Sequence, residues 1–588
     1  MQNNWKNNLK NNLILEKKFL LELKNLLEDK KINFGKKIIW KKWEEKIWKK
    51  FVERDFFKLK NKFSEENNIS HVKNIDLIQA FREMRKSWEM EENKDLERII
   101  SRRKVRSESW VAVITNMTKP FPCPWECVYC PTAADMPKSY LPNQPAAMRA
   151  VLNKFDPFNQ TQNRLASLMI TWHDVSKIEI IIIWWTWSYL PVDYQEEFIL
   201  QTYNWLNQKV DENFVSRDWD MFKVPKIKQT EFAKTLEEAT LKNETADYRC
   251  VWMTLETRPD RISVDEIKRF RRYWCTRVEL WVQSLFDDVQ EITKRGHTRQ
   301  DVADAMQLLR DAWYKVSFHL MPWLPWSNTE KDRETVRLTF EDENFKPDLV
   351  KFYPCMVIPD TELAQDWKAW KYQPLRDEDL KPVLMDLIQL VPRWCRITRL
   401  IRDIPAESVL DWCKTINLRQ LVEKEMKEKW IEMQDIRSRE IKADEIKMEN
   451  IEMRRDNFKA SWWDEIFLSF DTKKNDSKEV SDKLISLLRL RIPSQYFTKE
   501  KHFLEELEWC AIIREVHTYW VQTVVWWKEW DWNSQHFWFW RKLLAEAEKI
   551  AKEEYWLSKI AVIAGVWVRK YYEKFWYKKV WTYMVKKI

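Results

Sequence analysis

Three closely spaced cysteines constrain this chain more than any other feature. Cys123, Cys127 and Cys130 have the spacing C-x3-C-x2-C, follow the apolar run 111–114 and precede a proline. Three thiolates on one tight loop can bind three irons of a [4Fe–4S] cluster and leave the fourth iron open. A structural zinc site normally has a fourth ligand in a second nearby pair, and none follows here. The spacing therefore predicts a cluster with these three ligands, against the alternative of three cysteines that are simply buried.

The iron without a cysteine ligand suggests that the cluster binds a small molecule. Such an iron can chelate the amino and carboxyl groups of S-adenosylmethionine (SAM), and Tyr129 is placed to pack against the adenine. The segment Trp184-Trp185-Thr186 follows an apolar run and would hold the SAM amino group through backbone contacts, provided that both tryptophans were glycines. We therefore predict SAM binding at this end of the strands.

The segment from 111 to about 410 alternates strand-length apolar runs with helical patterns. The runs lie at 178–183, 250–256, 278–283, 315–321 and 349–354. Alternation of this kind predicts parallel βα units and a barrel whose mouth carries the chemistry. Several polar residues stand at or near strand ends and could face this mouth, although structural pairing explains each of them equally well. They are Glu256, Arg258, Glu279, Gln283 and His319.

The last 125 residues follow a different pattern. Strands are predicted at 465–470, 484–491, 511–519, 559–564 and 579–586, with a long helix from Gln535 and another helix at 567–574. The helix begins Gln535-His-Phe-Trp538-Phe-Trp540-Arg541. With glycine at 538 and 540 this would be Q-x-x-G-x-G, the pyrophosphate loop of GNAT acetyltransferases, in which bare amides at a helix N-terminus face phosphates.

The glycine and tryptophan contents are abnormal. The chain has 3 Gly and 38 Trp, whereas about 7% glycine, or about 41 residues, is typical. The two counts together reach that expectation, and tryptophans stand in pairs and in polar loops where glycine is usual. We hypothesise that most are glycines in the native protein, as happens where UGA is read as glycine. The alternative is a truly tryptophan-rich chain with large apolar area exposed in its loops.

Charge and termini suggest the partner and the compartment. The net charge is +9, and residues 1–50 hold 14 Lys against 6 Asp and Glu. This helical N-terminal region and the arm Ser101-Arg-Arg-Lys-Val-Arg106 could bind RNA phosphates, although a solvated charged run is the ordinary interpretation. Nine scattered cysteines, no signal peptide and no membrane-length apolar run predict a cytoplasmic protein without membrane contact.

Together these motifs resemble one family. The chain resembles elongator protein 3, the catalytic subunit of Elongator, in five short motifs. They are Met117-Thr-Lys-Pro, Glu256-Thr-Arg-Pro-Asp, Arg295-Gly-His-Thr, Arg402-Asp-Ile-Pro and Arg569-Lys-Tyr-Tyr. The resemblance covers about residues 75–588. It implies an α/β fold, a partial radical-SAM (β/α) barrel followed by a GNAT domain. The expected parts are a basic helical region at 1–106, the barrel at 107–390, a connecting region at 391–463 and the GNAT domain at 464–588.

The resemblance also implies an activity. Family members use SAM-derived radical chemistry and acetyl-CoA to convert the wobble uridine of tRNA to 5-carboxymethyluridine, binding the anticodon stem–loop. It implies Lys177, Tyr571 and Tyr572 as catalytic residues. The implied cofactor-binding set is Lys177, Trp184, Trp185, Thr186, Glu515, Val516, His517, Thr518, Gln535, Phe539, Trp540, Arg541 and Tyr572.

Other readings stay open at this point. A protein lysine acetyltransferase would need the GNAT domain but gives the cysteines no role, and an inactive tRNA-binding scaffold follows if every Trp is real. This chain has tryptophan at several positions where family members have glycine, among them Trp125, Trp281, Trp323, Trp326 and Trp576. Trp394, in contrast, falls where relatives also carry Trp. With only Cys395 and Cys413 nearby, the sequence does not decide whether a zinc site persists. The electron donor is unknown, and a homodimer is one option.

Overall fold

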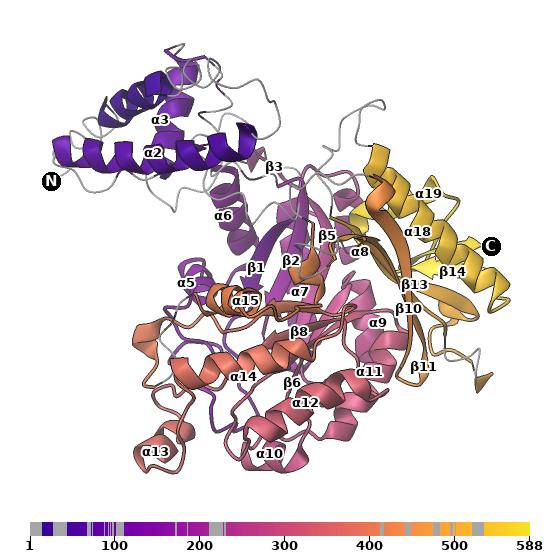
Figure 1. Cartoon of the computed structure of the whole chain (residues 1–588). Coiled ribbons are helices and arrows are strands. Elements are labelled where there is room, and N and C mark those ends of the chain that lie inside the picture. Colours follow the sequence, from indigo (N-terminus) through magenta and orange to yellow (C-terminus); the bar gives the residue numbers. More distant parts are fainter. Residues whose placement is uncertain are drawn as a thin grey trace. The chain divides into compact units, whose positions relative to one another are not determined.

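The computed structural model (Figure 1) describes most of the chain in two compact units. It describes residues 14–26, 44–67, most of 72–100, 111–210 apart from 171, 172, 174 and 185, 227–228, and 231–588 apart from 412–414, 416, 442–447, 474–481, 494–497, 500 and 520–533. One unit holds Met1–Ala112, Asn163–Val175 and Glu212–Pro225. The other holds Val113–Gln162, Ser176–Asp211 and Lys226–Ile588.

The first unit contains the predicted N-terminal helices. A helix spans residues 14–26, and α2 (Glu44–Glu66) and α3 (Asn74–Lys86) follow. Their apolar faces share a core that includes Phe19, Phe63 and Phe81. The helical spacing of leucines and phenylalanines is therefore confirmed for these stretches. The basic arm 101–106 lies outside the described residues.

The first large sheet is the predicted parallel barrel sheet. Its order is β1-β2-β5-β6-β7-β8-β9, and every pair from β2 to β9 is parallel. The strands are β1 (Ala112–Met117), β2 (Lys177–Ile183), β5 (Arg249–Thr257), β6 (Arg277–Gln283), β7 (Lys315–Leu320), β8 (Leu349–Phe352) and β9 (Arg396–Arg399).

Helices follow these strands, as βα units require. They are α7 (Val192–Leu206), α9 (Val264–Arg272), α11 (Arg299–Asp311), α12 (Thr329–Glu341) and α14 (Asp377–Gln389). Side chains of Thr298 and Asn328 cap α11 and α12, which explains where these helices begin. The sheet ends at 399 rather than at 390, because β9 pairs with β8.

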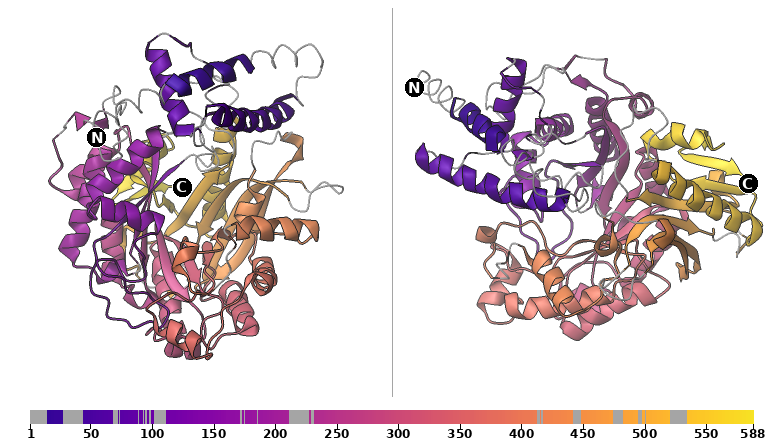
Figure 2. Two further views of the ribbon diagram at one scale, coloured as in Figure 1. Left: turned by 90° about the vertical axis from the view of Figure 1, so that its left-hand side faces the viewer. Right: turned by 45° about the horizontal axis from the view of Figure 1, so that its top comes forward.

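The second sheet is mostly antiparallel. Its order is β10-β11-β12-β13-β14-β16-β15, and only β13 and β14 run parallel. The strands are β10 (Ile451–Ala460), β11 (Trp463–Thr472), β12 (Leu484–Arg491), β13 (Cys510–Thr518), β14 (Lys559–Val562), β15 (Lys578–Val580) and β16 (Tyr583–Lys587). Helix α18 (Ser534–Glu553) packs against β11 to β14 (Figure 2).

Two features of this sheet differ from the sequence-based expectation. The sheet begins at Ile451, because β10 pairs with β11 along its whole length. We expected residues up to 463 to belong to the connecting region. The single strand expected at 579–586 is a hairpin, because the chain turns at Trp581, whose φ is 50°.

The two sheets belong to one unit and share a buried ionic interface. Glu465 of β11 accepts hydrogen bonds from Arg310 of α11 at 2.7 Å and from Arg514 of β13 at 2.8 Å. Arg514 also binds Asp348, just before β8, through two bonds of 2.7 Å. These contacts join the base of the barrel sheet to the second sheet. No described helix is long and apolar enough to cross a membrane.

Candidate active site

The cysteine loop lies where β1 ends. Prolines at 120, 122 and 124 stop the strand, because proline cannot donate to a sheet ladder. Cys123 is half-buried, and Cys127 and Cys130 are buried; all three are free thiols. The Cys130 N–H donates to the Cys127 carbonyl at 3.0 Å, and the Val128 N–H donates to the Thr293 carbonyl at 3.3 Å. The structure therefore brings the three predicted ligands together on one anchored loop.

Two buried arginines give this loop a positive environment. Arg295 lies 3.7 Å from the Cys127 sulfur, and Arg258 donates to the Arg295 carbonyl at 2.6 Å. A hydrogen bond with Cys130, together with the charges of Arg295 and Arg258, lowers the pKa of Cys127 well below its usual range. The thiolate is the form that binds iron. Burial raises the pKa of Cys123, and a hydrogen bond with Cys127 together with burial raises the pKa of Cys130, so Cys127 is the thiol held toward the thiolate. Three thiols gathered beside two arginines fit a cluster.

Three buried polar groups near the loop lack a partner among the described residues. They are both amide atoms of Gln283, the Thr186 hydroxyl and the Tyr129 hydroxyl. Gln283 ends β6 with φ of 69°, a strained backbone for any residue but glycine. Buried polar groups in native proteins normally find a partner, so these orphans indicate a ligand at this end of the strands. Trp185 lies outside the described residues.

Four adjacent strands each place one ionisable residue inside the barrel. They contribute Glu256 from β5, Glu279 from β6, His319 from β7 and Lys351 from β8, and all four are buried. His319 Nε2 lies 2.8 Å from Glu279, and the Lys351 ammonium contacts the same carboxylate. Lys351 also lies 3.9 Å from Glu256. Ligand atoms of the two glutamates and His319 lie within 4.8 Å of one another, but Lys351 already supplies the balancing cation, so we assign no metal.

Burial and these neighbouring charges shift the pKa values of Glu256, Glu279 and His319 in different directions. Burial raises the pKa of Glu256 to about 7, with Glu279 adding to the effect and Lys351 opposing it. Burial and Lys351 lower the pKa of His319 to about 3, so its imidazole is neutral. Burial alone would raise the pKa of Glu279, but Lys351 and His319 more than offset it and hold that pKa well below its usual range. One protonatable carboxyl thus faces one fixed carboxylate.

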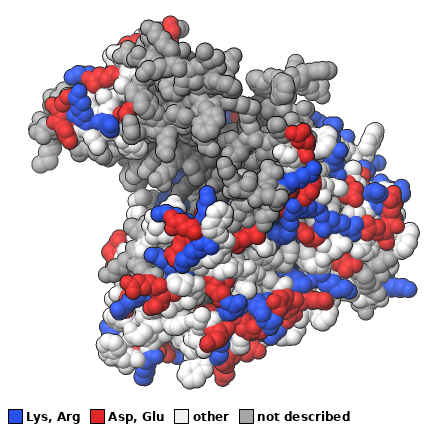
Figure 3. All heavy atoms as spheres, viewed as in Figure 1, with Lys and Arg blue, Asp and Glu red and all other residues white. Residues whose placement is uncertain are grey.

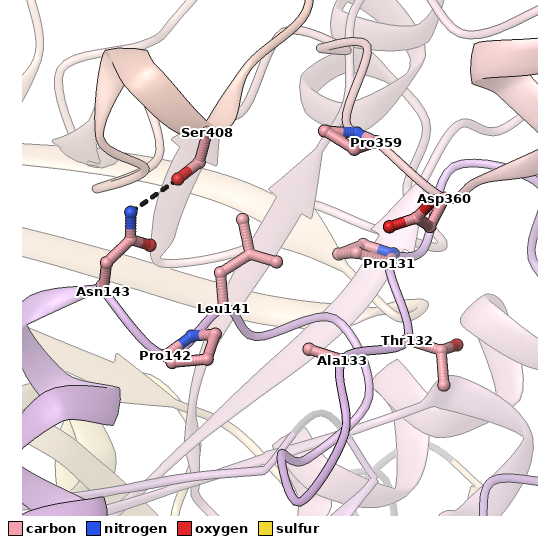
Figure 4. Close-up of a pocket in the computed structure, with 9 residues that line it drawn as sticks. All are labelled: Pro131, Thr132, Ala133, Leu141, Pro142, Asn143, Pro359, Asp360 and Ser408. Carbon is pink, nitrogen blue, oxygen red and sulfur yellow. Dashed lines mark hydrogen bonds between the residues drawn. The ribbon is translucent and has the colours of Figure 1, made fainter.

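A surface pocket of about 320 Å³ opens beside the cysteine loop. It begins at Pro131, directly after Cys130, and Figure 4 shows Asn143 reaching Ser408 across it. That hydrogen bond is 2.6 Å long. The lining is Pro131, Thr132, Ala133, Leu141, Pro142, Asn143, Pro359, Asp360 and Ser408. The lining contains none of the three cysteines, so the pocket adjoins the loop and does not contain the ligands.

Lys177 lies at the other end of the barrel. It begins β2, whereas Trp184 follows the last residue of that strand, and seven strand residues span roughly 20 Å. The Lys177 ammonium lies 5.0 Å from the ring of Trp567, between β14 and α19 (Arg569–Glu573). The structure therefore places Lys177 with the second sheet and not with the cysteines.

The predicted residues of β13 have mixed environments. Glu515 pairs with Lys315 at 3.2 Å and Arg489 at 2.9 Å. Burial alone would raise the pKa of Glu515, but these two cations lower it to about 2. His517 lies 5.6 Å from the ring of Trp252, Thr518 shares a 2.8 Å hydrogen bond with a serine, and Val516 packs at the edge of the core. Glu515 is thus part of the interface network.

The helix that should carry the pyrophosphate loop is present, but its second turn is crowded. Trp540 is buried, with ring centroids 4.7 Å from Tyr571 and 4.9 Å from Phe575. We expected Trp184 and Trp540 to project into a pocket or into solvent rather than fill a core. This was wrong for both, because both side chains are buried, and aromatic rings enclose Trp540. Trp538 is 38% exposed, as expected.

The remaining predicted residues of α18 and α19 differ in their exposure to solvent. Phe539 and Tyr572 are buried, and burial raises the pKa of Tyr572 above its usual range. Arg541 is exposed, with its guanidinium 5.4 Å from the ring of Phe575. The side chain of Gln535 lies outside the described residues.

Sequence reasoning missed Lys351 and did not single out Arg295 as a site residue. Lys351 interrupts the apolar strand Leu349–Phe352, and a lone cation inside a buried strand is itself a signal. Arg295 stands beside Gly296 in the motif Arg-Gly-His-Thr, whose role became visible only when folding placed it against Cys127.

Comparison with known proteins identifies the family. Residues 122–339 match the Radical SAM superfamily, and residues 347–428 match the Radical_SAM C-terminal domain. The tRNA uridine(34) acetyltransferase of Methanocaldococcus jannaschii is 38% identical over 534 residues, covering 88% of this chain and 91% of that protein. Elongator complex protein 3 of Saccharomyces cerevisiae is 34% identical, covering 82% and 84% of the two chains.

A solved structure agrees with these sequence matches. The structure of an N-terminally truncated Elp3 from Methanocaldococcus infernus is 36% identical, with a TM-score of 0.67, and covers 82% of this chain and all of that one. The relatives exceed 30% identity over most of both chains, and the cysteine loop lies within the superfamily match. The chain therefore belongs to the family of tRNA uridine(34) acetyltransferases and Elongator complex protein 3.

Proposed function

We propose that this chain modifies the wobble uridine of tRNA, using SAM-dependent radical chemistry and acetyl-CoA to form 5-carboxymethyluridine. The observation that carries the proposal is the cysteine loop, with a buried arginine on Cys127 and orphaned polar groups beside it. Cys123, Cys127 and Cys130 would hold a [4Fe–4S] cluster. A reduced cluster with bound SAM supplies a 5′-deoxyadenosyl radical.

The chain's own residues have defined tasks in this proposal. Arg295 and Arg258 offset the thiolate charge, and Gln283, Tyr129 and Thr186 offer unfilled hydrogen-bonding groups to SAM. The interior group of Glu256, Glu279, His319 and Lys351 offers a carboxyl that titrates near neutrality to the reacting substrate. A general acid or base is most effective when its pKa lies near the working pH.

Acetyl-CoA would bind at the second sheet. The support is the helix α18 after β13, the Gln535 motif, and Lys177 beside Trp567. Lys177, Tyr571 and Tyr572 stay our proposed catalytic residues there, with contacts from Glu515 to Thr518 and from Phe539 to Arg541. Because Lys177 and the cysteine loop lie at opposite ends of β2, the two cofactors occupy separate ends of the barrel in this proposal.

The tRNA partner is supported by charge. The net charge is +9, and the surplus lies in the first fifty residues. On the face shown in Figure 3, the described lysines and arginines are interspersed with acidic residues. We therefore place the main tRNA contact on the basic N-terminal region 1–106. Cytoplasmic location and a homodimer stay proposals.

The decisive experiment measures acetyl-CoA turnover with and without tRNA, in the wild type and in Cys127→Ala. We expect turnover that requires tRNA, and a modified uridine only in the wild type. Turnover on protein lysines without tRNA, unchanged by Cys127→Ala, would favour a lysine acetyltransferase. No turnover in any arm, with retained tRNA binding, would favour a scaffold.

A salt titration tests the RNA contact. Affinity for tRNA should fall steeply as salt rises, because lysines and arginines displace counterions from phosphates. Removal of residues 1–106 should weaken tRNA binding more than acetyl-CoA binding. Equal losses of both would show that the region is structural and would refute the placement.

A further inference from the structure

Tryptophan is the commonest residue among the described positions whose backbone has positive φ, the left-handed region. Among the described residues, 21 non-glycine residues have positive φ, and 11 of these are tryptophans. They are Trp274, Trp313, Trp323, Trp326, Trp370, Trp430, Trp462, Trp509, Trp556, Trp576 and Trp581, with φ between 49° and 79°. Positive φ is uncommon outside glycine, asparagine and aspartate, and bulky side chains there are true outliers. Chance alone does not gather one bulky residue type in this region.

Four of these tryptophans occupy the residue after a helix C-cap. Trp274, Trp313, Trp370 and Trp430 follow the C-caps of α9, α11, α13 (Glu362–Lys368) and α15 (Leu418–Glu428). After each helix the tryptophan N–H and the next N–H both turn back to helix carbonyls, as Lys371 does to the Asp366 carbonyl at 2.8 Å. This is the Schellman motif, whose left-handed residue is usually glycine.

Two further tryptophans stand in tight hairpins. Ser461 and Trp462 form the two-residue loop between β10 and β11, with φ of 48° and 67°. Trp581 begins the two-residue loop between β15 and β16. Type I′ loops need positive φ at both central residues, as at 461 and 462, and type II′ loops need it at the first, as at 581. Glycine or asparagine is preferred at such positions. The helix ends and the hairpins thus require the same residue for independent reasons.

The two glycines of the described residues show two uses of this residue, positive φ at Gly296 and close backbone approach at Gly565. Gly296 has φ of 71°, like the tryptophans. A side chain at Gly565 would place its Cβ 1.9 Å from the Val251 carbonyl oxygen. Six of the left-handed tryptophans are also at least 58% exposed, so their indoles contribute no core packing: Trp326, Trp370, Trp430, Trp462, Trp556 and Trp576.

Inside the barrel, Trp281 occupies the space beside the cysteine loop. Its indole packs with Met117 and Tyr140 and against Cys123, and lies 4.9 Å from the ring of His319. The indole N–H is buried without a partner among the described residues. A buried indole usually finds a hydrogen bond. The ring therefore lies in a mainly apolar cluster while its N–H stays unsatisfied among the described residues.

We propose that the eleven left-handed tryptophans and Trp281 are glycines in the protein as its host makes it, encoded by UGA codons that the host reads as glycine. The helix ends and hairpins then have their usual residue. Loss of the Trp281 indole opens a space between Cys123 and His319, bordered by the interior carboxylates. That space would take SAM, a consequence that rests on the proposed function.

Peptide masses of the protein purified from its own host test the proposal directly. Peptides that span positions 274, 281, 313, 370 and 430 should each be lighter by the difference between a tryptophan and a glycine residue, and the codons should read UGA. Tryptophan masses with UGG codons at these positions would overturn the proposal.

A recombinant comparison gives a second, independent test. The sequence with tryptophan throughout is compared with a variant that has glycine at the six exposed left-handed positions, where no cavity results. The variant should melt roughly 10 °C higher, because each left-handed tryptophan strains the backbone. The matched control is Trp394→Gly, since Trp394 is buried and stacks on Phe458 at 4.4 Å, and this variant should melt lower. An equal or lower melting temperature for the six-glycine variant would contradict the proposal.

The cavity is tested separately by binding. Calorimetry with S-adenosylhomocysteine should show at least tenfold tighter binding to Trp281→Gly than to the tryptophan form. Glycine masses without any gain in binding would count against the proposed SAM site and leave the glycine assignment standing. Tighter binding by the tryptophan form would count against glycine at 281.

Discussion

Two buried groups of charged residues lie in this molecule, and they differ in how completely they are paired. At the interface of the two sheets, Glu465 accepts from three arginines, Arg310, Arg491 and Arg514. At the cysteine end of the barrel, both amide atoms of Gln283 and one ring nitrogen of His319 have no partner among the described residues. At the interface, several arginines satisfy each buried carboxylate, although Arg310 Nε has no hydrogen-bond partner among the described residues. At the cysteine end, an equally buried amide side chain has no partner at all among them.

The difference separates a structural role from a ligand-binding one. Buried charges that satisfy one another add specificity to the packing of two domains but leave nothing to offer a ligand. Buried polar groups without partners persist only where something else satisfies them. We therefore expect substitutions at the interface to change stability, and substitutions at the cysteine end to change chemistry.

The largest effect should follow Cys127→Ala. Reconstituted wild-type protein should bind about four irons, and this variant should lose cluster binding and SAM cleavage. Because Cys127 is buried in a core cluster and lies 3.7 Å from Arg295, circular dichroism first shows that the iron-free variant is folded. Iron content and cleavage are measured anaerobically. Retained cleavage would remove Cys127 from the ligand set.

The next effect should follow Glu465→Gln at the interface. The change removes the carboxylate that pairs with Arg310, while Arg491 keeps Asp311 and Arg514 keeps Asp348. It should lower the free energy of unfolding by about 3–5 kcal/mol, because Arg310 stays buried without that counter-charge. Denaturant unfolding measures it, and iron binding by the folded protein should not change. Glu554→Gln is the control, since Glu554 pairs with Arg455 on the surface and should cost about 0–1 kcal/mol. Equal effects of the two substitutions would refute the special role of the interface.

The pH dependence of stability should have opposite signs in the two regions. The pKa of Glu256 is raised to about 7, so its contribution to stability is complete below its unfolded pKa near 4.5 and is lost as pH rises through 7. The pKa of Glu515 is lowered to about 2, so its contribution is present above pH 4.5 and is lost as pH falls through 2.

Unfolding curves from pH 4 to 8 test the Glu256 part. Relative to Glu256→Gln, the wild type should lose on the order of 2–3 kcal/mol as pH rises from 4.5 to 7. The interface control, Glu515→Gln, should show no such loss relative to wild type over this range. A flat difference between wild type and Glu256→Gln would mean that Glu256 is ionised throughout.

The smallest effect should come from Gln283→Gly. This substitution relieves a left-handed backbone and removes an unpaired buried amide, so it should stabilise the free protein by about 1 kcal/mol. It should also weaken SAM binding, because the orphaned amide is the group we assign to the ligand. Destabilisation without any change in SAM affinity would place Gln283 among the structural residues.

Local patterns in the sequence were sufficient to predict much of the barrel sheet and the cysteine loop. The spacing of Cys123, Cys127 and Cys130 predicted one loop, and apolar runs predicted β2, β5, β6, β7 and β8. Both signals depend on neighbours along the chain, so they survive without knowledge of the fold. The resemblance to the family also rests on local motifs, and it placed glycines at positions such as 323, 326 and 576 before their positive φ was known.

Contacts between residues that are far apart in the chain could not be predicted from these local patterns. The sequence did not predict strand β10, because β10 is an edge strand with one exposed face and charged residues alternate along it. Lys351 was missed because its two carboxylate partners come from other strands. The hairpin at Trp581 was missed because tryptophan gives no turn signal where glycine would have given one.

The sequence by itself determined the order of the domains, the cysteine loop and the family motifs, because these depend on residue type and spacing within a few turns or strands. Only the tertiary structure decided that Arg295 lies on Cys127, that Glu515 belongs to an interface, and that Lys177 stands at the end of β2 away from the cysteines. The physical reason is that a buried charge is defined by its partners, and folding brings those partners from segments that the sequence keeps far apart.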